Sequence, residues 1–270
     1  MLAGIFSRTY AAKGDAVFAA IQADRFTAAQ LNLSSLGLES LPHSLPEEVV
    51  LQAKDDAAKH GVLLAALSGT YNMIHPDIAY RKAQRGKFAN VVQAAKLMGI
   101  GVVTLCTGSR DKNNMWAHHA DNQSAEAWRD FRVELDAALA LADGLTLAIE
   151  PEPGNVVRDA KIARRLLDEV GSRHLKIILD AANLIGQDGI PRQHQIMAAA
   201  FELLGQDVVL AHAKDIDTKG KVVPPGQGAV DLKAFAALLK CAKFSGAFVA
   251  HGFDEKDANA AGVYLKKMLT

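Results

Sequence analysis

The chain has 270 residues, half of them hydrophobic, and its formal net charge at pH 7 is zero. Without a basic stripe or a charged tail, it is a poor partner for nucleic acid or for an anionic membrane surface. No run of about 18 apolar residues predicts a membrane-spanning helix, and the start shows no signal peptide. Cys106 and Cys241 lie far apart, which is typical of reduced thiols rather than of a disulfide framework. We therefore expect a soluble, cytoplasmic protein.

Short apolar runs recur along the whole chain, and each ends in a polar or turn-forming cluster. Runs of this length between turn signals indicate buried strands. In chain order, the predicted strands are Leu2–Phe6, Ala29–Leu33, Val62–Leu67, Gly101–Leu105, Leu145–Ile149, Leu175–Leu179, Val208–Ala211 and Ala247–Ala250.

Amphipathic segments separate these strands. The second segment opens with Pro46 and two glutamates and stops at Gly61, as the rules for helix ends require. The predicted helices are Lys13–Ala23, Leu45–Gly61, Asp77–Gly99, Ala125–Gly144, Arg158–Val170, Pro191–Leu204, Asp231–Lys243 and Lys256–Leu269.

Strict alternation of apolar strands and helices predicts an α/β fold with parallel strands. Eight such units in about 250 residues match a single (β/α)8 TIM barrel, which would span residues 1–270 as one domain. The alternative is a doubly wound open sheet. That fold usually shows a glycine-rich phosphate turn after its first strand, and the segment FSRTYAAKG is not one.

Four successive predicted strands end at residues of types that commonly bind metal ions. The run 145–149 stops at Glu150, and the following strands deliver Asp180, His212 and His251. The carboxyl ends of barrel strands form the active-site face, and two carboxylates with two imidazoles suit a divalent cation. Taken singly, each carboxylate is more often a solvated group or a helix cap, and His212 could be a hydrogen-bonded core histidine. Their coincidence at four consecutive strand ends favours the metal site.

Other polar residues near the strand ends are candidate substrate contacts. Lys214 follows His212 by two positions and is a candidate to polarise a carbonyl or bind an anion, or else to pair with Asp215 or Glu150. Glu152 follows Glu150 by two positions, and we expect it at the rim of the site.

The loops after the third and fourth strands contribute further candidates. His75, Trp116 and His119 could contact substrate, and an indole can cover the apolar face of a sugar. The alternative is that DKNNMWAHHADN is only a polar loop with a helix cap.

The strand-end motifs LAIEPEPGN, ILDAAN, AHAKDID and PPGQGAVD resemble those of the sugar phosphate isomerase/epimerase superfamily, the xylose-isomerase-like TIM barrels. The segments SGTYNMIHPD and CTGSRDKNNMWAHHADN resemble one branch of it. The resemblance spans nearly the whole chain.

The resemblance implies a ligand set and a chemistry. In that family, the ends of strands five to eight give Glu, Asp, His and Glu around one divalent ion, often Mn, Co, Mg or Zn. Here these positions are Glu150, Asp180, His212 and His251. The family's two glutamates move a proton through an enediolate, and a histidine that touches substrate is often found where this chain has Asn183. His251 in place of the second glutamate removes the symmetric proton shuttle and favours isomerisation over simple epimerisation.

Three functions follow from these residues. The first is a divalent-metal-dependent sugar isomerase or epimerase, or a related lyase, acting on a small-molecule sugar or sugar derivative through Glu150 and Lys214. The second is a non-catalytic sugar- or metal-binding barrel. The third is an endonuclease IV-like phosphodiesterase, which needs a larger histidine set. Whether the chain forms a homo-oligomer stays open.

Overall fold

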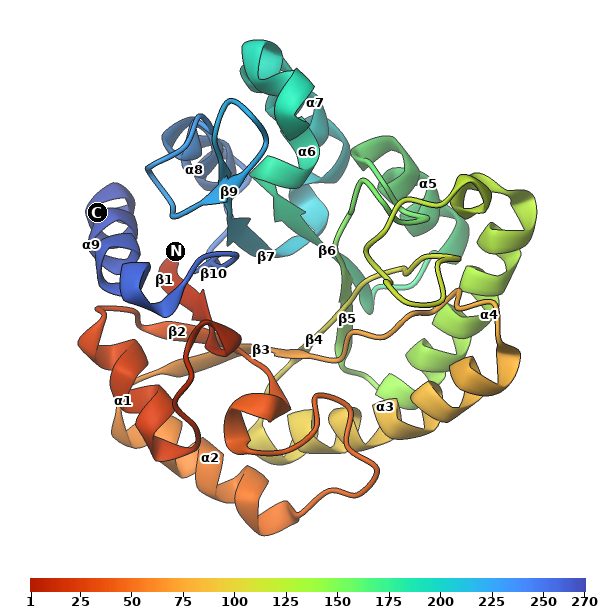
Figure 1. Cartoon of the computed structure of the whole chain (residues 1–270), viewed down its shortest axis with the longest axis horizontal. Coiled ribbons are helices and arrows are strands. Elements are labelled where there is room, and N and C mark those ends of the chain that lie inside the picture. Colours follow the sequence, from red (N-terminus) through yellow and green to blue (C-terminus); the bar gives the residue numbers. More distant parts are fainter.

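A computed structural model describes residues 1–270, and eight parallel strands close into a barrel in it (Figure 1). This confirms the predicted TIM barrel. Around the barrel, the strands follow the order β1-β10-β7-β6-β5-β4-β3-β2. Their bounds are β1 Leu2–Phe6, β2 Ala28–Leu31, β3 Leu63–Ser68, β4 Val102–Leu105, β5 Thr146–Ile149, β6 Leu175–Asp180, β7 Val208–Ala213 and β10 Ala247–Ala250.

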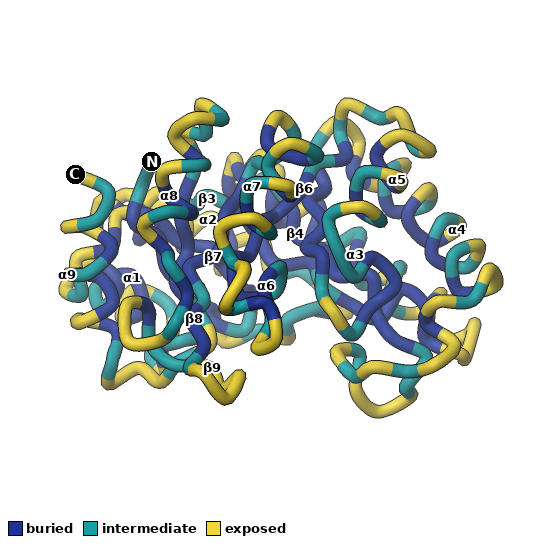
Figure 2. Tube along the Cα trace, turned by 90° about the horizontal axis from the view of Figure 1, so that it is seen from above, coloured by how far each residue is buried: buried dark blue, intermediate teal, exposed yellow.

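Helices surround the barrel, and Figure 2 shows the strands buried in the middle with exposed residues at the outer helix faces and the loops. Their bounds are α1 Asp15–Ala23, α2 Glu47–Lys59, α3 Ile78–Met98, α4 Ala125–Ala142, α5 Ala160–Val170, α6 Ala181–Gly189, α7 Gln193–Leu204, α8 Leu232–Cys241 and α9 Ala258–Leu269. No helix is long and apolar enough to span a membrane.

Two features differ from the expected pattern. The helix α6 directly follows β6, and it escapes a periodicity search because it is short and Gly186 interrupts it at φ +59°. A hairpin of β8 (Asp215–Ile216) and β9 (Val222–Val223) follows β7. Its strands have two residues each, too few to show an alternating pattern. The other predicted elements are present with ends shifted by up to a few residues.

The core has two layers because side chains alternate between the two faces of each strand. The outer layer lies between strands and helices and contains Leu67, Val103 and Ile149. The interior of the barrel is filled by small and branched residues: Ala28, Ala66, Ala148, Ile178, Leu210, Ala247 and Val249.

This alternation sets the position of the site. Counting two residues beyond the last interior residue of each strand, toward the carboxyl end, leads to polar side chains. They are Gln30, Ser68, Glu150, Asp180, His212 and His251. The barrel therefore carries a polar layer directly above its apolar interior.

Candidate active site

Glu150, Asp180, His212 and His251 lie together at the carboxyl end of the barrel. Each contributes one nitrogen or oxygen, and these four atoms all lie within 4.8 Å of one another. His212 Nδ1 is 3.0 Å from Glu150 Oε1 and 3.9 Å from Asp180 Oδ2, and His251 Nε2 is 3.0 Å from Asp180 Oδ2. Two carboxylates and two imidazoles this close together form a donor set that fits one divalent ion.

Local structure fixes the two carboxylates. Asp180 is both the last residue of β6 and the N-cap of α6, where its Oδ1 accepts a hydrogen bond from the Asn183 backbone N–H at 3.0 Å. This bond leaves Oδ2 free to face the cluster. Glu150 follows β5 directly, and Pro151 stops the strand there because proline cannot donate to the sheet.

Lys214 and Asn183 contact the carboxylates of Glu150 and Asp180. The Asn183 amide donates to Glu150 Oε1 at 3.0 Å and accepts from the Lys214 ammonium, which lies 3.4 Å from Asp180 Oδ2. Asp215 instead accepts hydrogen bonds from the backbone of the loop after β9, so it is not the partner of Lys214. Neither Lys214 nor Asn183 lines the central cavity.

The electrostatics keep both cluster carboxylates ionised at neutral pH. Burial raises the pKa of Asp180, but Lys214 and the two imidazoles outweigh it and hold that pKa well below its usual range. Burial likewise raises the pKa of Glu150, and His212 reverses the shift. Burial lowers the pKa of His212, yet the Glu150 carboxylate raises it overall. The pKa of His251 is lowered by burial and by the neighbouring His212.

A hydrogen-bond chain from the opposite strands orients His212. Its Nε2 lies 2.8 Å from Gln30 Oε1, and the Gln30 amide donates to Thr104 Oγ1 at 3.3 Å. Because an amide oxygen only accepts, His212 Nε2 carries a proton and Nδ1 faces the cluster. Gln30 and Thr104 were not among the site residues predicted from the sequence. A polar residue at an inward position of an apolar strand was the available signal.

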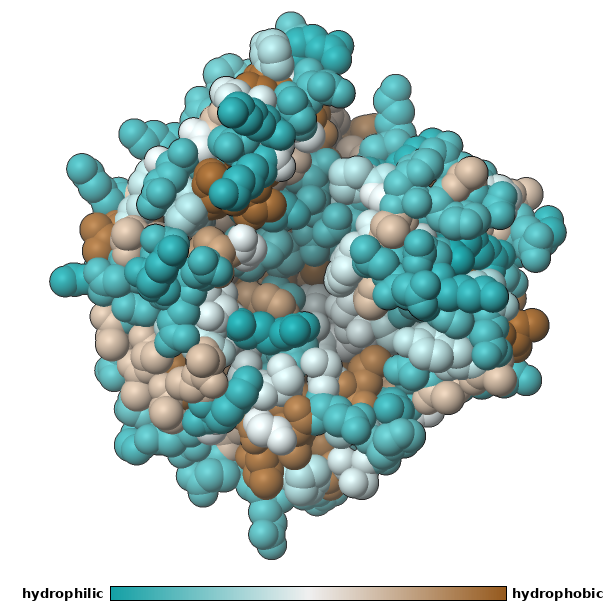
Figure 3. Space-filling model, viewed as in Figure 1, coloured by the Kyte–Doolittle hydropathy of each residue, from teal (hydrophilic) through white to brown (hydrophobic).

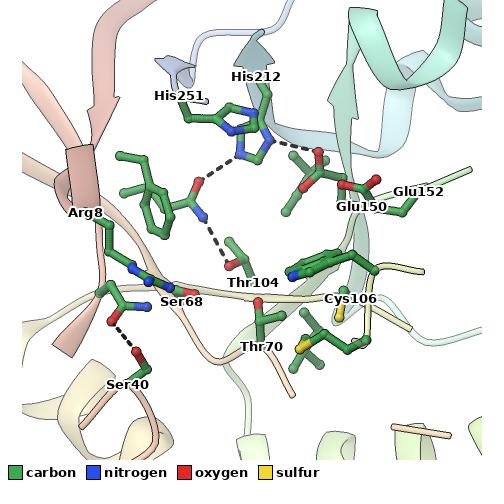
Figure 4. A pocket seen from close by; sticks show the side chains of 17 residues that line it. Arg8, Ser40, Ser68, Thr70, Thr104, Cys106, Glu150, Glu152, His212 and His251 are labelled. Carbon is green, nitrogen blue, oxygen red and sulfur yellow. Dashed lines mark hydrogen bonds and ion pairs between the residues drawn. The ribbon is translucent and has the colours of Figure 1, made fainter. Parts of the chain in front are cut away.

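The cluster borders a cavity of about 320 Å³ at the carboxyl end of the barrel (Figure 4). In the space-filling view, the face around the centre of the ring is hollowed (Figure 3). The lining includes Glu150, His212 and His251, together with Trp116 and Glu152. Glu152 belongs to the wall rather than to the outer rim, because the Pro-Glu-Pro turn directs it beside Glu150 (Figure 4). Burial and the charge of Glu150 raise the pKa of Glu152 to about 7.

Two other candidate histidines lie outside this cavity. His75 accepts from the Asp77 backbone N–H at 3.1 Å through Nδ1, contacts the Lys112 carbonyl at 3.3 Å through Nε2, and stacks on Tyr80. His119 accepts from the Asp121 backbone N–H and caps a short helical turn. His75 and His119 are therefore not gathered with Glu150, because both rings form hydrogen bonds with backbone groups of their own loops.

The β4–α4 loop, which carries Trp116, is held by three buried asparagines. Asn72 donates to the Ser109 carbonyl at 2.7 Å, Asn155 donates to the Met115 carbonyl at 2.9 Å, and Asn122 donates to the Gly154 carbonyl at 2.7 Å. A side chain at Gly154 would collide with the Trp116 carbonyl. The loop is thus packed against the turn that follows β5.

Solved structures with the same fold cover nearly the whole chain. A D-tagatose 3-epimerase-like protein is 15% identical with a TM-score of 0.80, covering 100% of this chain and 97% of its own. A 3-keto-D-glucoside 4-epimerase from E. coli is 16% identical with a TM-score of 0.75, covering 99% of both chains. A zinc-bound IOLI protein is 17% identical with a TM-score of 0.73, covering 99% of this chain and 96% of its own.

The search of curated proteins gave no match. The family model described as "Xylose isomerase-like TIM barrel" matches residues 18–268. This match agrees with the closed barrel and with the carboxylates and imidazoles gathered at its carboxyl end. The chain belongs to the xylose isomerase-like TIM barrel family.

Proposed function

We propose that this protein is a divalent-metal-dependent sugar isomerase or epimerase, with isomerisation as its main reaction. The observation that carries the proposal is the convergence of Glu150, Asp180, His212 and His251 at one edge of the cavity at the carboxyl end of the barrel. The likeness to structures named as epimerases, and to one with bound zinc, supports an isomerase-type chemistry with a metal.

The four clustered side chains would hold the ion. When bound, such an ion polarises a carbonyl and its neighbouring hydroxyl and so acidifies the carbon between them. Glu150 lies at the cavity wall and is ionised, so it is placed to take a proton from a substrate carbon. Asn183 and Lys214 keep the two carboxylates in position and balance part of their charge.

The substitution at position 251 determines which proton transfers are possible. An imidazole that ligates through one nitrogen has no lone pair left there to accept a proton. Glu150 and Glu152 both follow β5 and line the same side of the cavity in Figure 4. We therefore expect protons to move on one face of the substrate, as in an isomerisation, rather than between two opposed bases.

Solvent proton exchange tests this proposal directly. The protein is loaded with Mg²⁺ or Zn²⁺ and incubated in D₂O with a panel of aldoses and ketoses, and ¹H NMR follows the loss of the signal beside the carbonyl. We expect exchange with at least one sugar, and none after chelation. A metal-loaded protein that binds a sugar but exchanges no proton with any of the panel would be a binding barrel instead.

A further inference from the structure

Arg8 lies at the cavity on the side away from the metal cluster. It follows β1 in a short helical turn, Ser7–Thr9, and lines the cavity with Asn32 and Ser68. Figure 4 shows Arg8 across the cavity from Glu150 and Glu152. The cavity is therefore polar at both ends, with different chemistry at each.

The guanidinium of Arg8 has no partner within the protein: it forms neither an ion pair nor a hydrogen bond. Other arginines beside the strand ends are paired with carboxylates. Arg81 and Arg110, for example, both contact Asp130 Oδ2 at 2.8 Å. An arginine that faces a cavity and is not paired with a carboxylate is open to an anion from outside.

The polar groups beside Arg8 add hydrogen-bond donors. The Asn32 side-chain oxygen already accepts from the Ser34 backbone N–H at 2.9 Å and from Ser40 Oγ at 2.8 Å, so its amide hydrogens are the groups left to bind a ligand. The Ser68 hydroxyl makes no hydrogen bond within the protein. Asn32 and Ser68 are only 3% and 6% exposed, yet both border the cavity.

We propose that Arg8, with Asn32 and Ser68, binds an anionic group of the substrate, a carboxylate or a phosphate ester, at the end remote from the reacting carbonyl. This inference rests on the proposed function and names the class of its substrate. A guanidinium fork matches the oxygens of either anion in a bidentate geometry, whereas a neutral hydroxyl uses only one of its donors.

The lining of the cavity supports this class. Arg8 is the one arginine or lysine among the residues that line it, and its charge attracts an anion and raises its local concentration.

The test measures binding rather than turnover. Isothermal titration compares D-fructose, D-fructose 6-phosphate and D-fructuronate on the parent chain, on Arg8→Gln and on the matched control Arg192→Gln. Arg192 is exposed and does not line the cavity. Each titration is made with Mg²⁺ and again after chelation, because Arg8 is not a candidate metal ligand.

We expect at least one of the two anions to bind roughly ten- to a hundred-fold more tightly than fructose, as charge-assisted hydrogen bonds predict. Arg8→Gln should remove most of that advantage and lower the affinity for fructose much less, whereas Arg192→Gln should retain the advantage. The preferred anion identifies the source as a phosphate ester or a carboxylate.

Two results would overturn the inference: equal affinities for neutral and anionic ligands, or an anion preference that survives in Arg8→Gln. Neither result depends on metal binding or on proton exchange. Failure of the proposed function is therefore distinguishable from failure of this inference.

Discussion

The two halves of the barrel's active-site face occupy equivalent positions but carry different chemistry. β5, β6, β7 and β10 lead to buried carboxylates and imidazoles that fit a metal ion. β1 to β4 lead to Arg8, Gln30, Ser68 and Thr104, which offer one cation, an amide and hydroxyls. Strand alternation places Gln30, Ser68 and Thr104 inward as it does the four clustered residues, and Arg8 follows β1 in a helical turn. Residue type therefore divides the face into a half that we propose binds metal, called the metal-binding half below, and a hydrogen-bonding half.

The largest expected effect is on the metal-binding half. Glu150→Gln should reduce solvent proton exchange by about two to four orders of magnitude even with saturating metal, because an amide cannot accept the proton. Glu152→Gln should be milder, since Glu152 does not belong to the cluster. NMR exchange rates in D₂O measure both variants. Equal and severe losses would show that the two glutamates act together.

The second prediction concerns metal affinity. Asp180→Asn should weaken binding of a divalent ion by more than about 100-fold. A charged donor is lost, and replacing even a residue that only hydrogen-bonds to a metal ligand costs about 10- to 100-fold. The control is Asp188→Asn, which changes an exposed residue of α6, the helix that Asp180 caps. Plasma-emission spectrometry after dialysis gives the metal content. Equal metal in Asp180→Asn and in the parent would refute the site.

The third prediction tests the hydrogen bond between Gln30 and His212, which joins the two halves of the face. Gln30→Leu removes the acceptor that fixes the ring of His212, and we expect metal affinity to fall by about ten-fold. Thr104→Val should cost less, because it affects His212 only through Gln30. The ¹⁵N chemical shifts of the His212 ring should show mixed tautomers in Gln30→Leu. An unchanged tautomer would mean that Gln30 has no orienting role.

The smallest expected effect is on the scaffold of the hydrogen-bonding half. Burial raises the pKa of Asp130, but Arg81 and Arg110 outweigh it and hold that pKa below its usual value. Its stabilising contribution is therefore present above the unfolded-state pKa of about 3.9 and is lost as pH falls through the folded value. Thermal unfolding of Asp130→Asn should depend less on pH between about 5 and 3 than that of the parent. An identical acid profile in both proteins would contradict this.

The barrel could be predicted from the sequence because the patterns that indicate it are local. Strand and helix periods, helix ends and the spacing of βα units are all readable in one chain, and the polar residues at four strand ends stand out against apolar runs. The metal cluster follows from these signals and from the rule that barrel strands converge at their carboxyl ends.

The other residues of the site could not be predicted without the three-dimensional structure. Gln30 reaches His212 across the barrel, and no spacing in the sequence connects two residues 182 positions apart. His75 and Trp116 both lie in polar loops, yet only Trp116 lines the cavity, because the loop conformation decides the direction of each side chain. Helix α6 was missed because Gly186 disrupts its period.

The close packing of Gly154 against the Trp116 carbonyl has a consequence for kinetics. Because Asn122 and Asn155 tie the β4–α4 loop to the turn after Glu150, that loop can open only if these hydrogen bonds break or if the turn moves with it. The loop therefore cannot serve as an independent gate, and substrate must enter while it stays in place. We expect the rates of sugar entry and release to be set by diffusion through the cavity mouth rather than by a slow loop motion.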